Sequence, residues 1–504
     1  MYEEWAGIAA SNAAQAATWE GSIAGMPIGA FRTLARTEAL ALADSFSASL
    51  GVPVAHPGDA SGLIVMTGHQ PELYHPGVWV KDFLLQRLAD EIGATGIDVV
   101  VDSDGFDRVE LRTPCFSTGV GRCAAVLAES GPDGCYACTP SPSEREVAAF
   151  REAGCEALET LPAPALLRHF GCFCDGLASA CAENEDLASA ITVARRRYEA
   201  RAGTTYLELP LTRQARTSSF RRFVTHLTLD AARFAQAYNS ELAAFRERTG
   251  TRSQAQPFPD LDVSSELVEL PLWLAADGRR RTVWARTGDA PALLADGEVI
   301  VALGAEPDVA LARLSAAELT IAPKALALTL FERLFVADMF IHGVGGGRYD
   351  QVTDGVIARF FGFEPPRFAV ASMTLYLPLG AHEVTDAEVA EVEQQLNRLA
   401  HNPDQFLGEM EFESIAERER VTALAAEKCD LVLAIAEPDA DKKTIGARIR
   451  EVNAEMATLM EPFVREIKAE LDELNTLRDA SEVLTDRTYP FCLWDPLEVA
   501  DKVR

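Results

Sequence analysis

Residues 61–81 read SGLIVMTGHQPELYHPGVWVK, and this stretch decides the fold. A short apolar run over residues 63–66 stops at Thr67-Gly68, and a polar segment with two histidines follows. An amphipathic helix is expected from near Gly77. This pattern is typical of a buried parallel strand followed by a helix. In open α/β sheets ligands bind outside such strand ends, where the free N–H groups of the helix start attract anions.

The next elements extend this strand into a βαβ unit. Gly93 ends the helix, and residues 97–101 (IDVVV) predict a second buried strand that stops at Asp102. A strand, a helix and a strand within about 40 residues predict a parallel pair with a right-handed crossover. The fold class is therefore α/β, with a parallel sheet as its core.

The whole chain divides by pattern into four expected parts. At 504 residues it is too long for one ordinary hydrophobic core. The parts are N-terminal helices and a connector over residues 1–60, a Rossmann-like core over residues 61–380, a helical arm over residues 381–482, and a C-terminal tail over residues 483–504 that packs on the core.

Two segments of the core have patterns of their own. Residues 141–250 are mostly helical and polar in pattern, which predicts a helical insertion or lid rather than further sheet. Residues 266–301 contain short apolar runs that predict strands, with Asp277-Gly278 as a hairpin turn. Residues 320–377 return to alternating helices and strands, including an apolar strand over residues 368–377.

The arm is expected to be an antiparallel coiled coil. Thr385 and Glu388 form a capping box. Apolar residues then recur at spacings of three and four, first over residues 389–399 and again over residues 445–463. Pro438 interrupts the pattern and Pro462 is expected to strain it. The apolar stripe is explained either by a homodimer or by packing within the chain against a helix over residues 412–436.

Composition limits the class of partner. Lys and Arg number 46 and Asp and Glu number 76, so the net charge is 46 − 76 = −30. Neither nucleic acid nor an anionic membrane is attracted to such a surface, which leaves a small molecule as the expected partner. Residues 1–21 carry acids instead of a basic region and do not resemble a signal peptide. A cytoplasmic location is expected.

Ten cysteines occur, mostly between Cys115 and Cys181, and no disulfide framework is needed in a reducing compartment. Cys135 and Cys138 form a CxxC motif, and Cys172 and Cys174 are a second close pair. Together they are either a four-sulfur zinc site or ordinary reduced cysteines. No metal site is predicted from these pairs. The basic runs 195–197 and 279–281 are expected to be solvated.

The polar segment after the first strand holds the first candidate site residues. His69 and His75 are candidates for catalysis, because imidazoles at a helix start can hold phosphate and stabilise charge on a leaving group. Thr67, Gly68 and Gln70 are expected to bind substrate or nucleotide. The alternative is that one histidine caps the helix and the other points into solvent. Lys81 is expected to be an exposed helix lysine.

Acidic residues follow the second strand in the sequence VDSDGFD. Asp102 is expected beside the histidines, where it would orient an amine or a metal, and it is the third catalytic candidate. Asp104 and Asp107 are weaker candidates for substrate binding, because Asp104-Gly105 also reads as a turn with solvated acids.

The third site element is HGVGGGRYDQVTD, residues 342–354. Three consecutive glycines permit close backbone approach, and the following helix offers a second anion pocket. The glycine spacing fits neither the dinucleotide fingerprint nor a P-loop. The expected substrate-binding residues of this element are Gly345, Gly346, Gly347, Arg348, Tyr349 and Asp350.

These stretches, in this order, resemble the bacillithiol-biosynthesis cysteine-adding enzyme family. The run 67–70 (TGHQ) is similar to that family's Thr-Gly-Gln-Gln loop, and Phe106-Asp107 is similar to the end of its acidic turn. Residues 322–324 and the glycine run 345–347 resemble its Ser-Pro-Asn helix and Gly-Gly loop. The helical arm also fits.

The resemblance implies a Rossmann-like core, a dimerising coiled-coil arm and a ligase of thiol biosynthesis that joins cysteine to a sugar-malate amine, with ATP or ADP as a possible cofactor. Departures from the family are His69 for a Gln, Asp104 for a His and Gly105 for an acid. The added histidines favour a nucleotidyltransferase-like reaction on ATP as an alternative. A noncatalytic dimeric scaffold is the alternative outside the enzymes.

Overall fold

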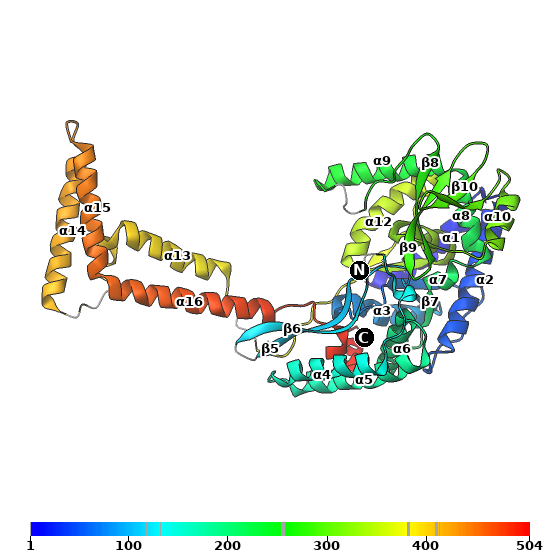
Figure 1. Cartoon of the computed structure of the whole chain (residues 1–504), viewed down its shortest axis with the longest axis horizontal. Coiled ribbons are helices and arrows are strands. Elements are labelled where there is room, and N and C mark those ends of the chain that lie inside the picture. The colour runs from blue at the N-terminus through cyan, green and yellow to red at the C-terminus, as the bar shows by residue number, and fades with distance from the viewer. Residues whose placement is uncertain are drawn as a thin grey trace. The chain divides into compact units, whose positions relative to one another are not determined.

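The structure is a computed structural model that describes residues 2–116, 119–131, 133–253, 258–380, 384–408, 412 and 414–503 (Figure 1). The chain forms two compact units. The core unit comprises Met1–Cys115, Arg122–Leu375 and Arg487–Arg504, and the arm unit comprises Phe116–Gly121 and Tyr376–Asp486. The expected C-terminal tail belongs to the core unit from Arg487 onward, and its helix α17 (Pro496–Val503) contacts α3 (Pro76–Ile92).

A five-stranded parallel sheet forms the centre of the core unit. Its strand order is β14-β13-β3-β4-β7. Strands β4 and β7 are added on one side of β3, and the later strands β13 and β14 are added on its other side. The strand order therefore reverses between β3 and β13. The strands are β3 (Ile64–His69), β4 (Thr95–Val100), β7 (Leu207–Pro210), β13 (Met339–His342) and β14 (Ala369–Val370).

The expected βαβ unit is confirmed. Strand β3 pairs in parallel with β4, and α3 connects them. Pro76 occupies the first turn of α3, where its missing N–H costs nothing, and Gly93 ends the helix with a left-handed φ of 65°. Strand β3 is longer than expected, since it continues through Thr67 and Gly68 to His69.

Alternate side chains of the strands face two different hydrophobic clusters, as a pleated sheet requires. Ile64 and Met66 pack in the cluster that contains residues of α2 and α8, whereas Val65 packs in the cluster that contains residues of α1 and α3. The sheet is therefore covered on both faces. The other helices of the core unit are α1 (Trp5–Ala16), α2 (Ile28–Ser47), α4 (Glu144–Glu159), α5 (Pro164–Glu183), α6 (Leu187–Glu199), α7 (Leu211–Gln214), α8 (Ser218–Leu229), α9 (Ala231–Thr249), α10 (Pro307–Ala316), α11 (Ala325–Phe331) and α12 (Val344–Val356).

The expectation that residues 141–250 form a helical insertion without further sheet is wrong. Strand β7 lies within this segment and pairs with β4, so the segment completes the parallel sheet. All four of its residues are buried. The strand is short and contains Glu208, so its pattern resembles the polar helices around it. The predicted strand over residues 368–377 is also shorter, with only Ala369–Val370 in the sheet.

An antiparallel sheet of order β11-β10-β9-β8-β12 adjoins these elements in the core unit. The hairpin between β8 and β9 turns at Asp277 and Gly278, which both have positive φ, so the predicted turn is confirmed. A separate hairpin, β5-β6, was not predicted. The strands are β5 (Arg108–Phe116), β6 (Val120–Glu129), β8 (Leu267–Ala276), β9 (Arg279–Arg286), β10 (Ala292–Ala295), β11 (Glu298–Ala302) and β12 (Thr320–Pro323); β1 (Ser22–Ile23) and β2 (Met26–Pro27) form a further small hairpin.

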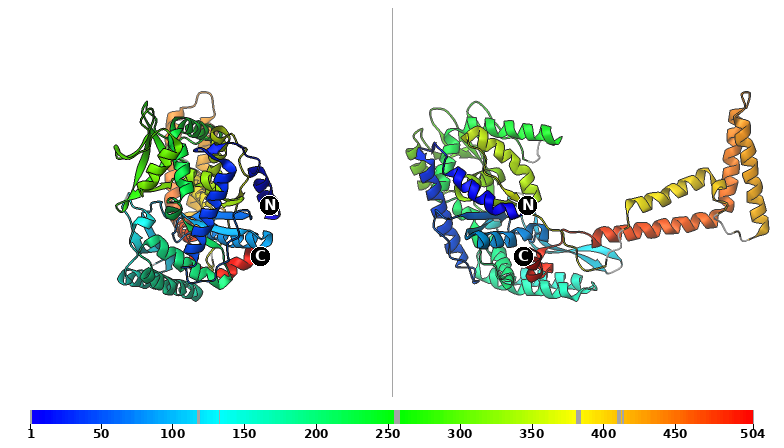
Figure 2. Two further views of the ribbon diagram at one scale, coloured as in Figure 1. Left: turned by 90° about the vertical axis from the view of Figure 1, so that its right-hand side faces the viewer. Right: turned by 180° about the vertical axis from the view of Figure 1, so that it is seen from behind.

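The arm unit consists of the helices α13 (Asp386–His401), α14 (Ile415–Ile435), α15 (Lys442–Leu459) and α16 (Glu461–Leu484). Helices α14 and α15 lie side by side in Figures 1 and 2. The Thr385–Glu388 capping box is present at the start of α13. Pro438 lies in the turn between α14 and α15. Pro462 lies in the first turn of α16, where proline is tolerated, so the predicted strain is wrong.

The apolar stripe of the arm is buried within this chain. Val452 and Met456 of α15 share a cluster with Val421 and Leu424 of α14, and none of the four is more than 1% exposed. Intrachain packing therefore satisfies this stripe. No helix in the described parts of the chain is both long enough and apolar enough to span a membrane.

A buried ionic cluster lies between α3, α6 and the strands β4 and β7. Arg195 of α6 contacts the carboxylates of Asp82, Asp98 and Glu208 at 2.9, 2.9 and 2.7 Å. Arg196 is fully buried and pairs with Glu199 at 3.2 Å. The expectation that this basic run is solvated is wrong for these two arginines, because the acids of the sheet are their partners.

Candidate functional site

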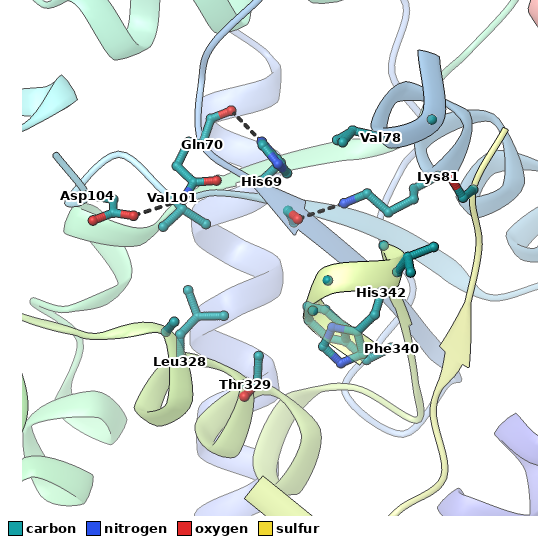
Figure 3. A pocket seen from close by; sticks show the side chains of 18 of the residues that line it. His69, Gln70, Val78, Lys81, Val101, Asp104, Leu328, Thr329, Phe340 and His342 are labelled. Carbon is teal, nitrogen blue, oxygen red and sulfur yellow. Dashed lines mark hydrogen bonds between the residues drawn. The ribbon is translucent and has the colours of Figure 1, made fainter. Parts of the chain in front are cut away.

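A cavity of about 700 Å³ opens at the carboxyl ends of β3 and β13, where the strand order of the sheet reverses (Figure 3). Its walls come from the end of β3 with the start of α3, the segment after β4, the start of α11, and the end of β13 with the start of α12. Trp273 of the antiparallel sheet, Ser372 and Arg487 of the C-terminal tail also line it. The polar and charged lining residues are His69, Gln70, His75, Lys81, Ser103, Asp104, Lys324, Thr329, His342, Ser372 and Arg487.

The lining carries an excess of positive charge in a strongly acidic protein. Lys81, Lys324 and Arg487 are the basic lining residues, and Asp104 is the single carboxylate among the lining residues. Lys324 is paired with Glu269 at 2.7 Å behind the lining. The first turns of α3 and α12 also face the cavity with Gly77 and Gly345. Free N–H groups at helix starts attract anions. The cavity therefore suits a ligand with negative charge.

Lys81 is a buried residue of this site, and its expected exposure is wrong. Its side chain is 2% exposed, and Nζ donates a hydrogen bond of 2.8 Å to the carbonyl of Gly68 (Figure 3). Burial lowers the pKa of Lys81, and the nearby acids Asp82 and Asp98 oppose that shift. Lys81 is one turn into α3, so the helix directs it back to the end of its own preceding strand.

His69 is the last residue of β3 and faces the cavity with about a quarter of its side chain exposed. Its Nδ1 is 3.2 Å from the carbonyl oxygen of Gln70. Burial of the ring, followed by the charge of Lys81, lowers the pKa of His69 to about 3. This shift favours the neutral imidazole at pH 7.

His75 combines two of the expected roles. It is the N-cap of α3, and its Nδ1 accepts a hydrogen bond of 3.0 Å from the backbone N–H of Gly77. The ring also lines the cavity. The cap holds the ring with Nδ1 toward the helix.

Gln70 and Asp104 are hydrogen-bonded to each other at the wall of the cavity. Gln70 Nε2 donates to Asp104 Oδ2 at 2.8 Å, and Arg280 Nη1 donates to Asp104 Oδ1 at 2.7 Å. Arg280 also lies 4.6 Å from the ring of Trp273, and Lys324 lies 4.3 Å from the same ring. The charge of Asp104 is thus neutralised by Arg280, and the antiparallel sheet contributes one wall of the site.

His342 and Asp350 form a buried pair at the end of β13. Nε2 of His342 is 2.9 Å from Oδ2 of Asp350, which Arg333 contacts at 2.6 Å. Thr329 donates a hydrogen bond of 2.7 Å to the other oxygen. Burial alone raises the pKa of Asp350, but the charges of Arg333 and His342 outweigh it and hold the pKa well below its usual value. Asp350 thus stays ionised and fixes the ring of His342, which lines the cavity.

The glycine run is the start of helix α12 and not a loop. The helix begins at Val344, and Gly345 and Gly346 line the cavity. A Cβ at Gly346 would lie 3.1 Å from Nδ1 of His342, so this glycine makes room for the ring. Gly347 is buried and does not line the cavity.

Gly347 allows α12 to pack on β14, and its substitution is expected to destabilise the fold. A Cβ at Gly347 would lie 2.3 Å from Cγ2 of Val370. Gly347→Ala should therefore lower the free energy of unfolding by about 1–3 kcal/mol, as overpacked cores do. Gly345→Ala is the matched control, because a Cβ there meets nothing within 4 Å. Urea denaturation of both variants measures the difference; equal stabilities would contradict this packing.

Five other predicted binding residues lie outside the cavity lining. Thr67 is buried and donates to the carbonyl of Ile341 at 2.8 Å, so it joins β3 to β13. Arg348 is exposed on α12, and Tyr349 packs against Phe245 and Phe258. Asp107 is exposed at a separate surface pocket that His69 and Gln70 also line. Asp350 is buried behind the cavity wall and contacts His342, which lines the cavity.

Asp102 does not line the cavity that holds His69. Its carboxylate accepts from the backbone N–H of Thr212 at 2.8 Å and from the Thr212 hydroxyl, and it borders a second cavity of about 470 Å³. Burial raises the pKa of Asp102 to about 7, although the two hydrogen bonds from Thr212 oppose the shift. Asp102 therefore holds the end of β4 to α7, the helix that follows β7, and its expected place beside His69 is wrong.

Asp102 gives the fold a dependence on pH that a substitution removes. The folded pKa of about 7 exceeds the ordinary 3.8, so the folded state binds more protons between these values. Stability from this group is complete below pH 4 and falls by up to about 4 kcal/mol as the pH rises to 7. Asp102→Asn should abolish this fall while leaving ligand binding at the first cavity intact. The free energy of unfolding of both proteins, measured by denaturation at pH 4.5 and 8, checks this prediction. If wild type and variant lost the same stability between the two pH values, the prediction would be refuted.

Several site residues were missed from the sequence. Lys324, Arg487 and Trp273 come from segments remote from residues 61–81 and carry no motif. His342 is the first residue of the glycine-rich segment. Its position at a strand end, eight residues before Asp350, is the sequence feature that indicates the pair. Among the described residues, no cluster of three or more His, Cys, Asp or Glu is placed to hold a metal ion, and Cys135 and Cys138 are joined to each other and not to Cys172 or Cys174.

The sequence matches no protein-family model and no curated protein.

Proposed function

We propose that this protein is an enzyme of the cysteine-adding ligase type, which joins an amino acid such as cysteine to a small amine or sugar-derived metabolite in the biosynthesis of a thiol. The observation that carries the proposal is the positively charged cavity at the ends of β3 and β13 in a protein of net charge −30. Such a cavity selects a small anionic substrate and holds it beside three imidazoles.

The strand order supports classing the core as Rossmann-like. Counted along the chain, the parallel strands lie in the order 5-4-1-2-3, which is the dinucleotide-binding order 3-2-1-4-5 read from the other edge. In that class the ligand binds where the strand order reverses. The cavity occupies this position between β3 and β13.

ATP or ADP is the proposed cofactor, and the cavity's donors fit its phosphates. Lys81, Lys324 and Arg487 supply positive charge, and the starts of α3 and α12 supply backbone N–H groups. A nucleotide would activate a carboxylate for attack. The residues of this chain would bind the phosphates and exclude water around them.

His342 is the proposed proton acceptor. An amine substrate must lose a proton before or as it attacks a carboxyl carbon, and a positioned neutral imidazole accepts protons of this kind. The ion pair with Asp350 fixes the ring orientation, and the resulting imidazolium would be stabilised by that carboxylate. His69, whose pKa is lowered by burial, would act as a hydrogen-bond partner.

Nucleotidyl transfer is a second candidate function. It is favoured by the position of His69 and His75 beside the start of α3, where a triphosphate would lie. Release of pyrophosphate with an adenylylated product would distinguish this reaction from ligation.

A homodimer through the arm, with coiled-coil packing, is proposed as well. Val432 and Leu433 near the end of α14 are exposed, and two copies could cover them. Light scattering of the purified chain and of Leu433→Glu tests this; a monomer in both samples would contradict it.

The proposed ligase is tested by comparing small-molecule thiols in cells with and without the gene. Loss of the gene should remove one thiol and accumulate its amine precursor. The wild-type gene should restore the thiol, and a His342→Gln gene should not. An unchanged thiol profile would overturn the ligase proposal.

A further inference from the structure

A disulfide joins Cys135 and Cys138 across the short turn Tyr136–Cys138. The two cysteines differ in their exposure to solvent. Cys135 is fully buried, whereas Cys138 is half-buried and lines the second cavity of about 470 Å³. A small molecule in that cavity can therefore reach the disulfide from the side of Cys138.

The turn that carries this disulfide supports the segment after β4. The backbone N–H of Tyr136 donates to the carbonyl of Asp104 at 3.1 Å, and that of Ala137 donates to the carbonyl of Asp102 at 2.9 Å. The Tyr136 ring stacks on Phe106 at 4.4 Å. Because Asp104 holds Gln70 at the wall of the first cavity, the disulfide is linked to that cavity by two steps of direct contact.

We propose that Cys135 and Cys138 are a reversible site of thiol–disulfide exchange with small-molecule thiols, and that the state of this pair sets the order of residues 102–107 beside the first cavity. The proposal concerns the second cavity and does not rest on the ligase activity.

The exchange proceeds in two balanced steps. A thiolate RS⁻ attacks the sulfur of Cys138, which breaks the Cys135–Cys138 bond, forms a mixed disulfide on Cys138 and releases Cys135 as a thiolate that takes up a proton. A second thiolate attacks the sulfur of the bound RS group and releases RSSR and the Cys138 thiolate, which is protonated in turn. Two RSH are oxidised to RSSR while the protein disulfide is reduced to two thiols.

The consequence of reduction is local. The loop that this disulfide closes is very short, so it constrains few states of the unfolded chain. The turn, however, loses the bond that keeps Tyr136 and Ala137 in position to donate. Residues 102–107 should therefore become more mobile while the fold persists.

The test uses the full chain and glutathione as the thiol. Wild type is equilibrated in mixtures of reduced and oxidised glutathione, alkylated and analysed by mass spectrometry. We expect the peptide with Cys135 and Cys138 to titrate reversibly in the folded protein. In Cys135→Ser, oxidised glutathione should form an adduct on Cys138, at least tenfold faster than on Cys135 in Cys138→Ser. A pair that is reduced only on unfolding, or a Cys135→Ser chain with no adduct on Cys138, would overturn the exchange site.

Hydrogen exchange tests the effect on the first cavity. The double variant Cys135→Ser/Cys138→Ser should exchange the amides of residues 102–107, 136 and 137 at least tenfold faster than oxidised wild type. The matched control is Cys115→Ser/Cys123→Ser, which removes the disulfide of the β5-β6 hairpin and should leave these amides unchanged. Equal exchange in the first double variant and wild type would overturn the link between the pair and the cavity.

Discussion

Arg195→Ala should lower the free energy of unfolding by about 3–5 kcal/mol, because it leaves several buried acids without their common partner. The guanidinium contacts Asp82, Asp98 and Glu208 within 2.9 Å, and all four side chains are at most 5% exposed. Burial already raises the pKa of Asp82 to about 8, although the positive charge of Arg195 opposes this shift. Without Arg195, these acids must take up protons or the fold must open.

Urea denaturation at pH 7 measures this loss, and Arg197→Ala is the matched control. Arg197 pairs with Glu183 at 2.5 Å, but Glu183 is half exposed and such pairs contribute about 1 kcal/mol or less. If the two variants were equally stable, the buried cluster would not hold the sheet to α6. Stability of Arg195→Ala should also fall as the pH rises, because protonation of the unpaired acids is then lost.

His342→Gln should lower turnover by about 10²–10⁴-fold with little change in stability, as removal of a general base does. Glutamine keeps a polar group of similar size next to Asp350, so the fold should persist. His56→Gln is the control, since His56 is exposed and lies outside the cavity lining. Retained turnover in His342→Gln, with circular dichroism unchanged, would remove His342 from the proposed chemistry.

Asp350→Asn separates positioning from proton transfer at the same pair. The ring of His342 should remain but lose its fixed carboxylate partner, which destabilises the imidazolium and lowers its pKa. The rising limb of the pH profile of turnover should therefore shift to lower pH. A loss of activity without any change in the pH profile would show that Asp350 acts only on the structure.

The central βαβ unit was predictable because each local signal agreed. An apolar strand, a histidine cap with Pro76 after it, and Gly93 at the helix end all specify the same element. Strand β7 was not predictable by these means. Its Glu208 is stable in the interior because Arg195 and Arg196 reach it from α6, and this compensation is visible only in three dimensions.

The site was predictable in its location but only partly in its members. His69, Gln70 and the start of the glycine run meet at one cavity, since the ends of parallel strands share one edge. Asp102 was misplaced because the segment after β4 turns it toward Thr212 and leaves Asp104 to face Gln70. Lys81 appeared exposed because helical spacing alone does not reveal that its amine bonds back to Gly68.

The central claim is that the cavity between β3 and β13 binds a small anion, and calorimetric titration with ADP tests it most directly. Wild type should bind ADP, and Lys81→Met should bind it about 10–100-fold more weakly, since a charged hydrogen bond contributes about 1.5–3 kcal/mol. Lys468→Met, an exposed position of α16, should bind like wild type. Equal affinity of wild type and a folded Lys81→Met, or no binding of ADP by wild type, would contradict the claim.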